Sequence, residues 1–285
     1  MRTYNAVGYA ILAAHAVLSA WLAPEWLGPW WGCAVGCAYL LVSWFVCGVY
    51  LSDVIHMGIA HRALDYEEWF VKAVTLLNNT VGIYVDPVSW TNRHRLHHKF
   101  TDHPGDPNKL DADGFWRTLY LCVFPYPCNS NVATDAILQT WPFRLVSHPL
   151  FTLVSPVLSV GLLWVLVRDW RFAVGVWVGV RVFALWVNMI QNYWTHDRRF
   201  GTRRYDDPHD NAMNIGDWFP VTVTFSACWQ NNHHHHPRFF RLTHDPAEYD
   251  FGFLTVSVMS ALGLVRPSES GRIAPEGLTL TEIGL

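Results

Sequence analysis

Long apolar stretches separated by polar segments are the strongest pattern in the chain. Four of them cover about residues 6–22, 31–54, 151–167 and 172–193. A helix needs roughly 20 residues to cross the hydrocarbon core of a bilayer, so each stretch predicts a membrane-spanning helix. The connections Pro24–Trp30 and Arg168–Arg171 are short. We therefore expect the four helices to form two hairpins.

Three shorter apolar stretches lie within the polar parts of the chain, at Trp69–Val85, Phe115–Phe124 and Trp218–Trp229. They are too short or too interrupted to span a bilayer, and we interpret them as helices that lie at the membrane surface. The residues from about 266 to 285 contain Gly, Pro and Ser and are expected to be a loose tail. Residues 1–265 are expected to form a single domain.

The composition agrees with an integral membrane protein. The chain is 51% hydrophobic and 15% charged, whereas soluble domains contain about 25% charged residues. Its 16 tryptophans are typical of the aromatic belts at membrane interfaces. The net charge of −3 gives no reason to expect a nucleic-acid partner. The six cysteines show no pairing pattern that would indicate a disulfide framework.

The basic residues predict how the chain is oriented. Of the 20 Lys and Arg residues, 17 lie at the N-terminus, in the long middle segment or in the tail. Two lie in the opposite hairpin turn, Arg168 and Arg171, and Arg181 lies inside the fourth apolar stretch. The positive-inside rule then places both termini and the middle segment in the cytoplasm. The short, alanine- and arginine-rich form favours a bacterial inner-membrane protein.

Most of the candidate chemistry lies in histidine clusters just beyond the apolar stretches. Three motifs stand out, HMGIAH, HRLHH and QNNHH, and the fourth stretch ends in NYWTH. Their polar side chains are His56, His61, His94, His97, His98, Gln230, His233, His234, Asn192 and His196. Neutral imidazole is the commonest metal ligand, and eight histidines exceed what one ion can use. The motifs therefore indicate two metal ions, and the lack of cysteine or acidic ligands argues against a structural zinc site.

The spacing within each motif predicts its geometry. Residues at i, i+3 and i+4 share one face of an α-helix, so HRLHH and QNNHH can each direct their side chains into one cavity. His56 and His61 are five residues apart, which corresponds to about 140° of rotation on an α-helix. We therefore expect the helix to end or bend between them, at Gly58. His235 and His236 fall off the shared face and are interpreted as bystanders.

Polar residues also recur along the fourth apolar stretch, where Arg181, Asn188, Asn192 and His196 fall on roughly one face. Polar side chains inside a membrane helix are costly and are usually functional. Isolated histidines elsewhere are interpreted as ordinary polar side chains: His15, His103, His148, His209 and His244.

The three motifs, in this order and in the longer contexts HRLHHKFTDHPGDP and WQNNHHHHP, resemble the histidine boxes of membrane fatty-acid desaturases. The nearest pattern is that of the stearoyl-CoA desaturase-like group. The resemblance implies an all-α integral membrane fold with four transmembrane helices and a cytoplasmic helical cap that holds a di-iron site. The implied metal ligands are His56, His61, His94, His97, His98, His196, His233 and His234, with Gln230 at the ninth, substituted position and Asn192 acting through water.

The resemblance also implies an activity. The chain would be an oxygen-dependent di-iron desaturase that introduces a double bond into a fatty-acyl or lipid alkyl chain. It would use O2 as co-substrate and take electrons from a separate ferredoxin, rubredoxin or cytochrome. No catalytic side chain is expected beyond the metal ligands, and the substrate head group stays open between CoA, acyl carrier protein and phospholipid.

Three other functions are compatible with parts of the pattern. A membrane di-iron hydroxylase would share the whole site and differ only in the fate of the substrate radical. A metal transporter would need ionisable residues deep inside the spans, where the sequence offers Arg181 and His15. The only support for a metal-free scaffold protein is Gln230, which stands at a position where the motif would have a histidine.

Overall fold

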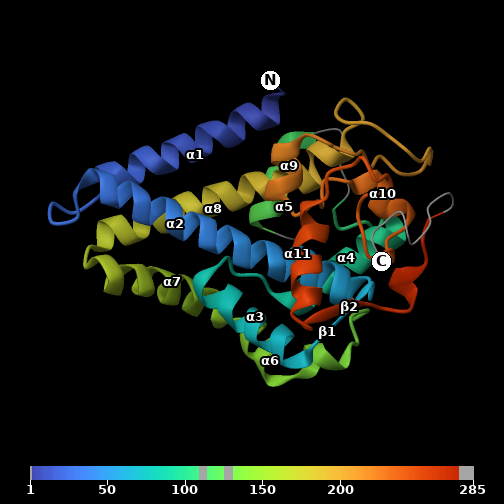
Figure 1. Cartoon of the computed structure of the whole chain (residues 1–285), viewed down its shortest axis with the longest axis horizontal. Helices are drawn as coiled ribbons and strands as arrows, with labels where there is room; N and C mark the ends of the chain where they lie inside the picture. The colour runs from blue at the N-terminus through green and yellow to red at the C-terminus, as the bar shows by residue number, and fades with distance from the viewer. Residues whose placement is uncertain (1, 109–113, 125–130, 276–285) are drawn as a thin grey trace.

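The computed structural model describes residues 2–108, 114–124 and 131–275, and Figure 1 shows an elongated helical bundle that leads into a cap of shorter elements. The bundle consists of α1 (Thr3–Trp21), α2 (Gly28–Gly48), α7 (Phe151–Val167) and α8 (Trp170–Asn192). α1 packs on α2 and α7 packs on α8, while α8 also contacts α1 and α2. The two predicted hairpins are therefore present, with the second turning at Arg168 and Asp169.

Two of these helices are long and apolar enough to cross a membrane. They are the continuous helical segments Gly28–Ala60 and Trp170–His196. α7, with 17 residues, is a shorter apolar helix, and α1, with 19 residues, does not pass the same test of length and hydropathy. All four predicted helices exist, but the assignment of four membrane spans stays a prediction.

Small residues allow the bundle helices to approach closely. A Cβ atom at Gly179 of α8 would collide with the ring of His15, and one at Gly8 of α1 would collide with Trp186. His15 is buried, and its Nε2 lies 3.0 Å from the carbonyl oxygen of Gly36 in α2. Small residues and side-chain hydrogen bonds of this kind are typical of packed membrane helices. His15 therefore joins α1, α2 and α8.

The cap is built from the shorter elements that follow α2 and α8 in the chain. They are η1 (Val49–Ala60), β1 (Leu64–Tyr66), α3 (Glu68–Val81), α4 (Pro87–Phe100), α5 (Gly114–Val123), η2 (Ala136–Gln139), α6 (Trp141–Val146), η3 (Trp194–His196), α9 (Trp218–Val223), α10 (Gln230–His235), α11 (Phe251–Ala261), β2 (Val265–Pro267) and η4 (Ser270–Arg272). The three stretches expected to form surface helices overlap α3, α5 and α9. The fold is mostly helical, with β1 and β2 as a small antiparallel ribbon in the described part.

The chain after residue 265 is held more firmly than the sequence suggests. In β2, Pro267 is paired with Leu64 of β1, and Ser268 donates its backbone N–H to the carbonyl of Ala63 at 3.0 Å. The Ser268 hydroxyl donates to the carbonyl of Arg62 at 2.7 Å. The segment expected to be loose from residue 266 thus begins by pairing with the residues that directly follow the first histidine motif. Residues 276–285 lie outside the described part of the chain.

The first histidine motif has a different backbone from the one expected. η1 is a π-helix that continues α2 without a break, and the N–H of His61 donates to the carbonyl of His56 at 3.0 Å. A π-helix joins residues five apart, so it brings His56 and His61 to the same side without a bend. Gly58 has another role: a Cβ atom there would lie 2.9 Å from the ring of Tyr66. The helix neither bends nor ends at Gly58, so that expectation was wrong, and η1 ends at Ala60, between the two histidines.

Candidate metal centre

The second and third histidine motifs lie on short helices of the cap. α4 starts at Pro87, and the carboxylate of Asp86 accepts hydrogen bonds from the N–H groups of Val88 and Ser89 at 3.1 and 3.2 Å. A proline at the first position and a capping aspartate both favour a helix start at this point. This start sets the rotation of the HRLHH residues that follow two turns later. α10 carries the QNNHH residues across from them.

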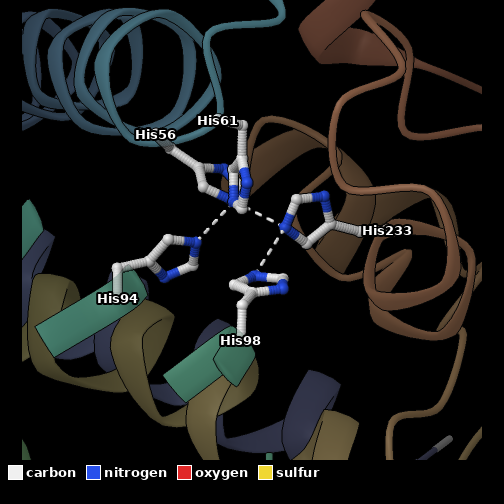
Figure 2. A group of neighbouring side chains, drawn as sticks. All are labelled: His56, His61, His94, His98 and His233. Carbon is white, nitrogen blue, oxygen red and sulfur yellow. Dashed lines mark hydrogen bonds between the residues drawn. The ribbon is translucent and has the colours of Figure 1, made fainter. Parts of the chain in front are cut away.

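Five histidines form one compact group, and Figure 2 shows their rings converging on a common centre. The group consists of His56 and His61 from η1, His94 and His98 from α4, and His233 from α10. Three Nε2 to Nε2 distances are 2.9 Å (His56 to His233), 2.7 Å (His61 to His94) and 3.1 Å (His98 to His233). Ligands about 2.1 Å from a metal ion lie about 3 Å from their neighbours, so the spacing fits a metal site.

The rings of this group are held in the state that binds metal. Burial, with the neighbouring imidazoles, lowers the pKa of four rings well below the ordinary value for histidine: His61, His94, His98 and His233. A metal ion takes a neutral imidazole as ligand, and the lowered pKa keeps these rings neutral. Protonated imidazoles would repel each other at these distances. The group is therefore suited to a cation and not to an anion.

A second group of three histidines adjoins the first: His97, His196 and His234. Their Nδ1 atoms face carboxylates of the cap. His97 Nδ1 lies 2.9 Å from both oxygens of Asp106, His234 Nδ1 lies 3.1 Å from Asp210, and His196 Nδ1 lies 3.8 Å from Asp102. A carboxylate on Nδ1 fixes the ring and leaves Nε2 for a metal, as in many metalloproteins.

Each carboxylate in this second group interacts favourably with the histidine that it faces. Burial raises the pKa of Asp106 and Asp210, but the hydrogen bonds and charges of the histidines outweigh it, so both carboxyls titrate below the ordinary aspartate range. Burial lowers the pKa of His234 to about 4, although Asp210 opposes that shift. The Nε2 atom of His234 is buried and has no hydrogen-bond partner. An orphaned buried acceptor of this kind is satisfied when a metal ion binds.

Gln230 and Asn192 lie beside the second group. Both line a cavity of about 130 Å³ together with His97 and His196. The Oε1 atom of Gln230 is buried without a hydrogen-bond partner, while Asn192 Nδ2 donates to Asn188 Oδ1 at 2.6 Å. The amide oxygen of Gln230 is thus available as a neutral oxygen ligand or as an acceptor for a bound water.

The structure divides two motifs that the sequence treated as units. From HRLHH, His94 and His98 join the five-histidine group, whereas His97 joins the three-histidine group. His233 and His234 are divided in the same way. The rings of His98 and His234 are 4.6 Å apart between centroids, so the two groups share a border. Neighbouring residues of each short helix thus serve adjacent sites.

A guanidinium that the sequence did not single out joins the first two motifs. Arg95 Nη2 donates to the carbonyl of Ile59 at 2.7 Å, and Arg95 Nε donates to the carbonyl of Ala60 at 3.1 Å. Arg95 Nη1 also donates to Asp135 Oδ2 at 2.7 Å, and the same carboxylate accepts from Arg62. The last carbonyls of η1 are thus capped by α4. This contact places His61 next to His94.

The remaining two histidines of the HHHH run lie outside both groups. His235 is exposed, and its ring stacks on Tyr205 with 4.0 Å between centroids. His236 packs against His244, whose centroid is 5.4 Å away. His244 is buried, and its Nδ1 lies 2.9 Å from the hydroxyl of Tyr205. This arrangement supports the interpretation of His235 and His236 as bystanders.

Comparison with known proteins gives the family. The family model for fatty acid desaturases matches residues 24–243. The chain is 28% identical over 236 residues to the sn-1 stearoyl-lipid 9-desaturase of Anabaena variabilis, covering 81% of this chain and 82% of the relative. It is 24% identical over 246 residues to Delta-9 acyl-lipid desaturase 1 of Arabidopsis thaliana, covering 81% and 76%.

A third relative acts on another kind of substrate. The hex-5-enoyl-[acyl-carrier protein] acetylenase of Moorena producens is 26% identical over 255 residues, covering 83% of this chain and 78% of the relative. The matched region 24–243 contains all three histidine motifs and both histidine groups. The chain belongs to the fatty acid desaturase family.

Proposed function

We propose that this protein is a membrane acyl-lipid desaturase that introduces a double bond into the acyl chain of a lipid. The observation that carries the proposal is the pair of adjoining histidine groups, built from the three motifs, in a chain of the desaturase family. Similarity to relatives named as stearoyl-lipid and acyl-lipid desaturases favours a lipid-bound chain over a CoA thioester.

The donor set fits two iron ions, one in each histidine group. The five-histidine group would hold one ion, and His97, His196 and His234 would hold the other, with Gln230 or a water on Asn192 completing its ligands. Imidazole suits iron, and an ion held by His97, His196 and His234 would lie beside the cavity that His97 and His196 line. When bound, the iron pair supplies the oxidation of an unactivated methylene by O2.

The residues of the chain itself position the ligands and the substrate. Asp106 and Asp210 hold the rings of His97 and His234 so that each Nε2 atom faces inward. The cavity beside them has apolar walls from Leu51 and Leu121 as well as polar walls. These walls would fix one methylene of an alkyl chain near the metal centre, and such positioning is the main contribution of a protein to cofactor chemistry.

The membrane topology and location of the enzyme follow from the same proposal. Four helices would span the membrane, with both termini and the cap in the cytoplasm and a bacterial inner membrane as the location. The helices α1 and α7 would then accompany the two longer candidate spans in the bilayer. A separate ferredoxin, rubredoxin or cytochrome would supply electrons from the cytoplasmic side.

A reconstituted assay tests this function. The purified, iron-loaded protein in liposomes receives a deuterium-labelled stearoyl-lipid, O2 and a reduced ferredoxin, and the products are analysed by mass spectrometry. Loss of a pair of hydrogens from the chain is expected, and a His98→Ala variant should give none. Gain of an oxygen atom instead would identify a hydroxylase, and an unchanged lipid would refute both.

A further inference from the structure

The helix α5 has two faces that serve different surroundings. Trp116 and Tyr120 are 74% and 57% exposed, and Val123 is also exposed on the same face, at spacings of four and seven residues. On the other face Thr118 is buried, and Leu121 lines the histidine cavity. The helix α5 therefore separates the cavity from the surroundings that its exposed face, with Trp116 and Tyr120, contacts.

The position of α5 along the bundle indicates which surroundings its exposed face contacts. The ring of Phe115 contacts Tyr193 and Trp194, at centroid distances of 5.3 and 6.2 Å, next to the end of α8. α8 begins at Trp170, which is 63% exposed. With its 23 residues, α8 is about 34 Å long at 1.5 Å per residue, close to the roughly 30 Å hydrocarbon thickness of a bilayer.

Trp170 and α5 therefore lie one bilayer thickness apart. Exposed tryptophans are enriched at both membrane interfaces, so Trp170 marks one interface and Trp116 marks the other. Figure 1 shows α5 beside α8 where the bundle meets the cap, and α9 nearby carries another exposed tryptophan, Trp218. α5 packs directly against α8, one of the two candidate membrane spans.

We propose that α5 lies in the interface of the cap-side leaflet, with Trp116 and Tyr120 among lipid acyl chains, and that acyl chains reach the histidine cavity laterally past Leu121. The substrate is then a lipid that stays in the leaflet while its chain enters the site. An acyl group carried by a water-soluble partner would first have to leave the aqueous phase to take this route. The route rests on the proposed function, whereas the position of α5 does not.

The depth of α5 is measured with a nitroxide spin label. Tyr120→Cys is labelled in a chain whose six native cysteines are replaced by alanine, reconstituted in phosphatidylglycerol and phosphatidylethanolamine liposomes. Arg238→Cys, at an exposed position of the cap, is the matched control. We expect O2 to relax the label at 120 more than a nickel chelate does, and the reverse at 238. Equal chelate access at both positions would overturn the proposed position, and Trp116→Cys provides an independent label if the first variant does not fold.

The route is measured by kinetics in the same liposomes. Replacing both Trp116 and Tyr120 by serine should raise the KM for bilayer lipid several-fold while kcat and iron content stay at wild-type values. Replacing both by phenylalanine keeps the aromatic face and should keep the wild-type KM. The route would be overturned if the variant with both serines kept the wild-type KM. It would also be overturned if the wild-type protein turned over carrier-bound acyl groups as fast as bilayer lipid. If the wild type oxidises no acyl chain at all, the proposed function fails, but the spin-label result still decides where α5 lies.

Discussion

Replacing Arg95 by glutamine should loosen the five-histidine group. Arg95 donates to the carbonyls of Ile59 and Ala60 at the end of η1 and to the carboxylate of Asp135. Burial alone would raise the pKa of Asp135, but its bonds to Arg95 and Arg62 have the larger effect and lower the pKa below the ordinary aspartate value. This carboxyl is therefore ionised at neutral pH. Glutamine is too short and has too few donors to make these contacts. The variant therefore removes a donor from the carbonyls of Ile59, Ala60 and Val132 and from part of the Asp135 carboxylate.

The size of the effect follows from burial. The side chains of Arg95 and Asp135 are only 17% and 12% exposed, and breaking a buried ion pair costs about 3–5 kcal/mol. Arg62 continues to bind Asp135, so we expect the lower limit, about 3 kcal/mol of lost unfolding free energy. At about 2 °C per kcal/mol for a large domain, Tm should fall by about 6 °C. Displaced supporting groups typically weaken metal binding roughly 10- to 100-fold.

Thermal unfolding and iron analysis of the purified variants provide the assay. Arg62→Gln is the matched control, because Arg62 binds the same carboxylate but is 66% exposed and donates to no carbonyl of η1 in the bonds described. Exposed ion pairs contribute about 0.2–1 kcal/mol, so this control should change Tm by about 1 °C. Equal Tm values and equal iron contents in the two variants would refute the role of Arg95 as the link between the first two motifs.

Three other predictions concern the site and its surroundings. Gln230→Ala should lower lipid turnover sharply and His235→Ala should not, because Gln230 lines the cavity whereas His235 is exposed; loss of iron in His235→Ala alone would contradict this register. Asp106→Asn should weaken iron binding roughly 10- to 100-fold in chelator competition, since His97 loses its carboxylate, and wild-type affinity would contradict the account. Burial lowers the pKa of His244 to about 3, below its value of about 6.5 in the unfolded chain, so the unfolded state binds the proton first and stability falls below about pH 6.5. Between about pH 7.5 and pH 5 this one group should remove about 2 kcal/mol of unfolding free energy, and His244→Phe should show a correspondingly smaller loss; identical pH profiles would exclude the effect.

The helices of the bundle could be predicted because their signal is local. Apolar length alone gave residues 151–167, and α7 covers Phe151–Val167. The spacing of HRLHH and QNNHH predicted one shared face on each helix, but the structure divides the histidines of each helix between two adjoining groups. Which helices cross the bilayer depends on neighbours and on lipid, so length and hydropathy select only two of the four.

The backbone of the first motif could not be predicted in this way. Five-residue spacing fits a bend, a helix end or a π-helix, and the sequence does not separate them. The choice of a π-helix depends on contacts with distant residues, such as the bonds from Arg95 to the carbonyls of Ile59 and Ala60. Gly58 suggested a bend, but the structure uses it to accommodate Tyr66.

The division of the histidines into two groups also depends on tertiary structure. His97 and His98 are adjacent in sequence, yet they face different partners: the ring of His97 binds Asp106, whereas His98 joins the five-histidine group. Asp106 lies in the extended second motif, so its proximity had a sequence signal. Asp210, which holds His234, follows a long irregular segment and had none.

Fatty-acid analysis of a host that expresses the protein tests whether the chain desaturates membrane lipids. Total lipids from cells with the wild-type chain are compared with those from cells with His97→Ala, at equal protein levels in the membrane fraction. We expect a new double bond in the acyl chains of membrane lipids in the wild-type cells and its absence in the His97→Ala cells. Identical acyl chains in both, in cells supplied with iron, O2 and a functional electron carrier, would contradict it.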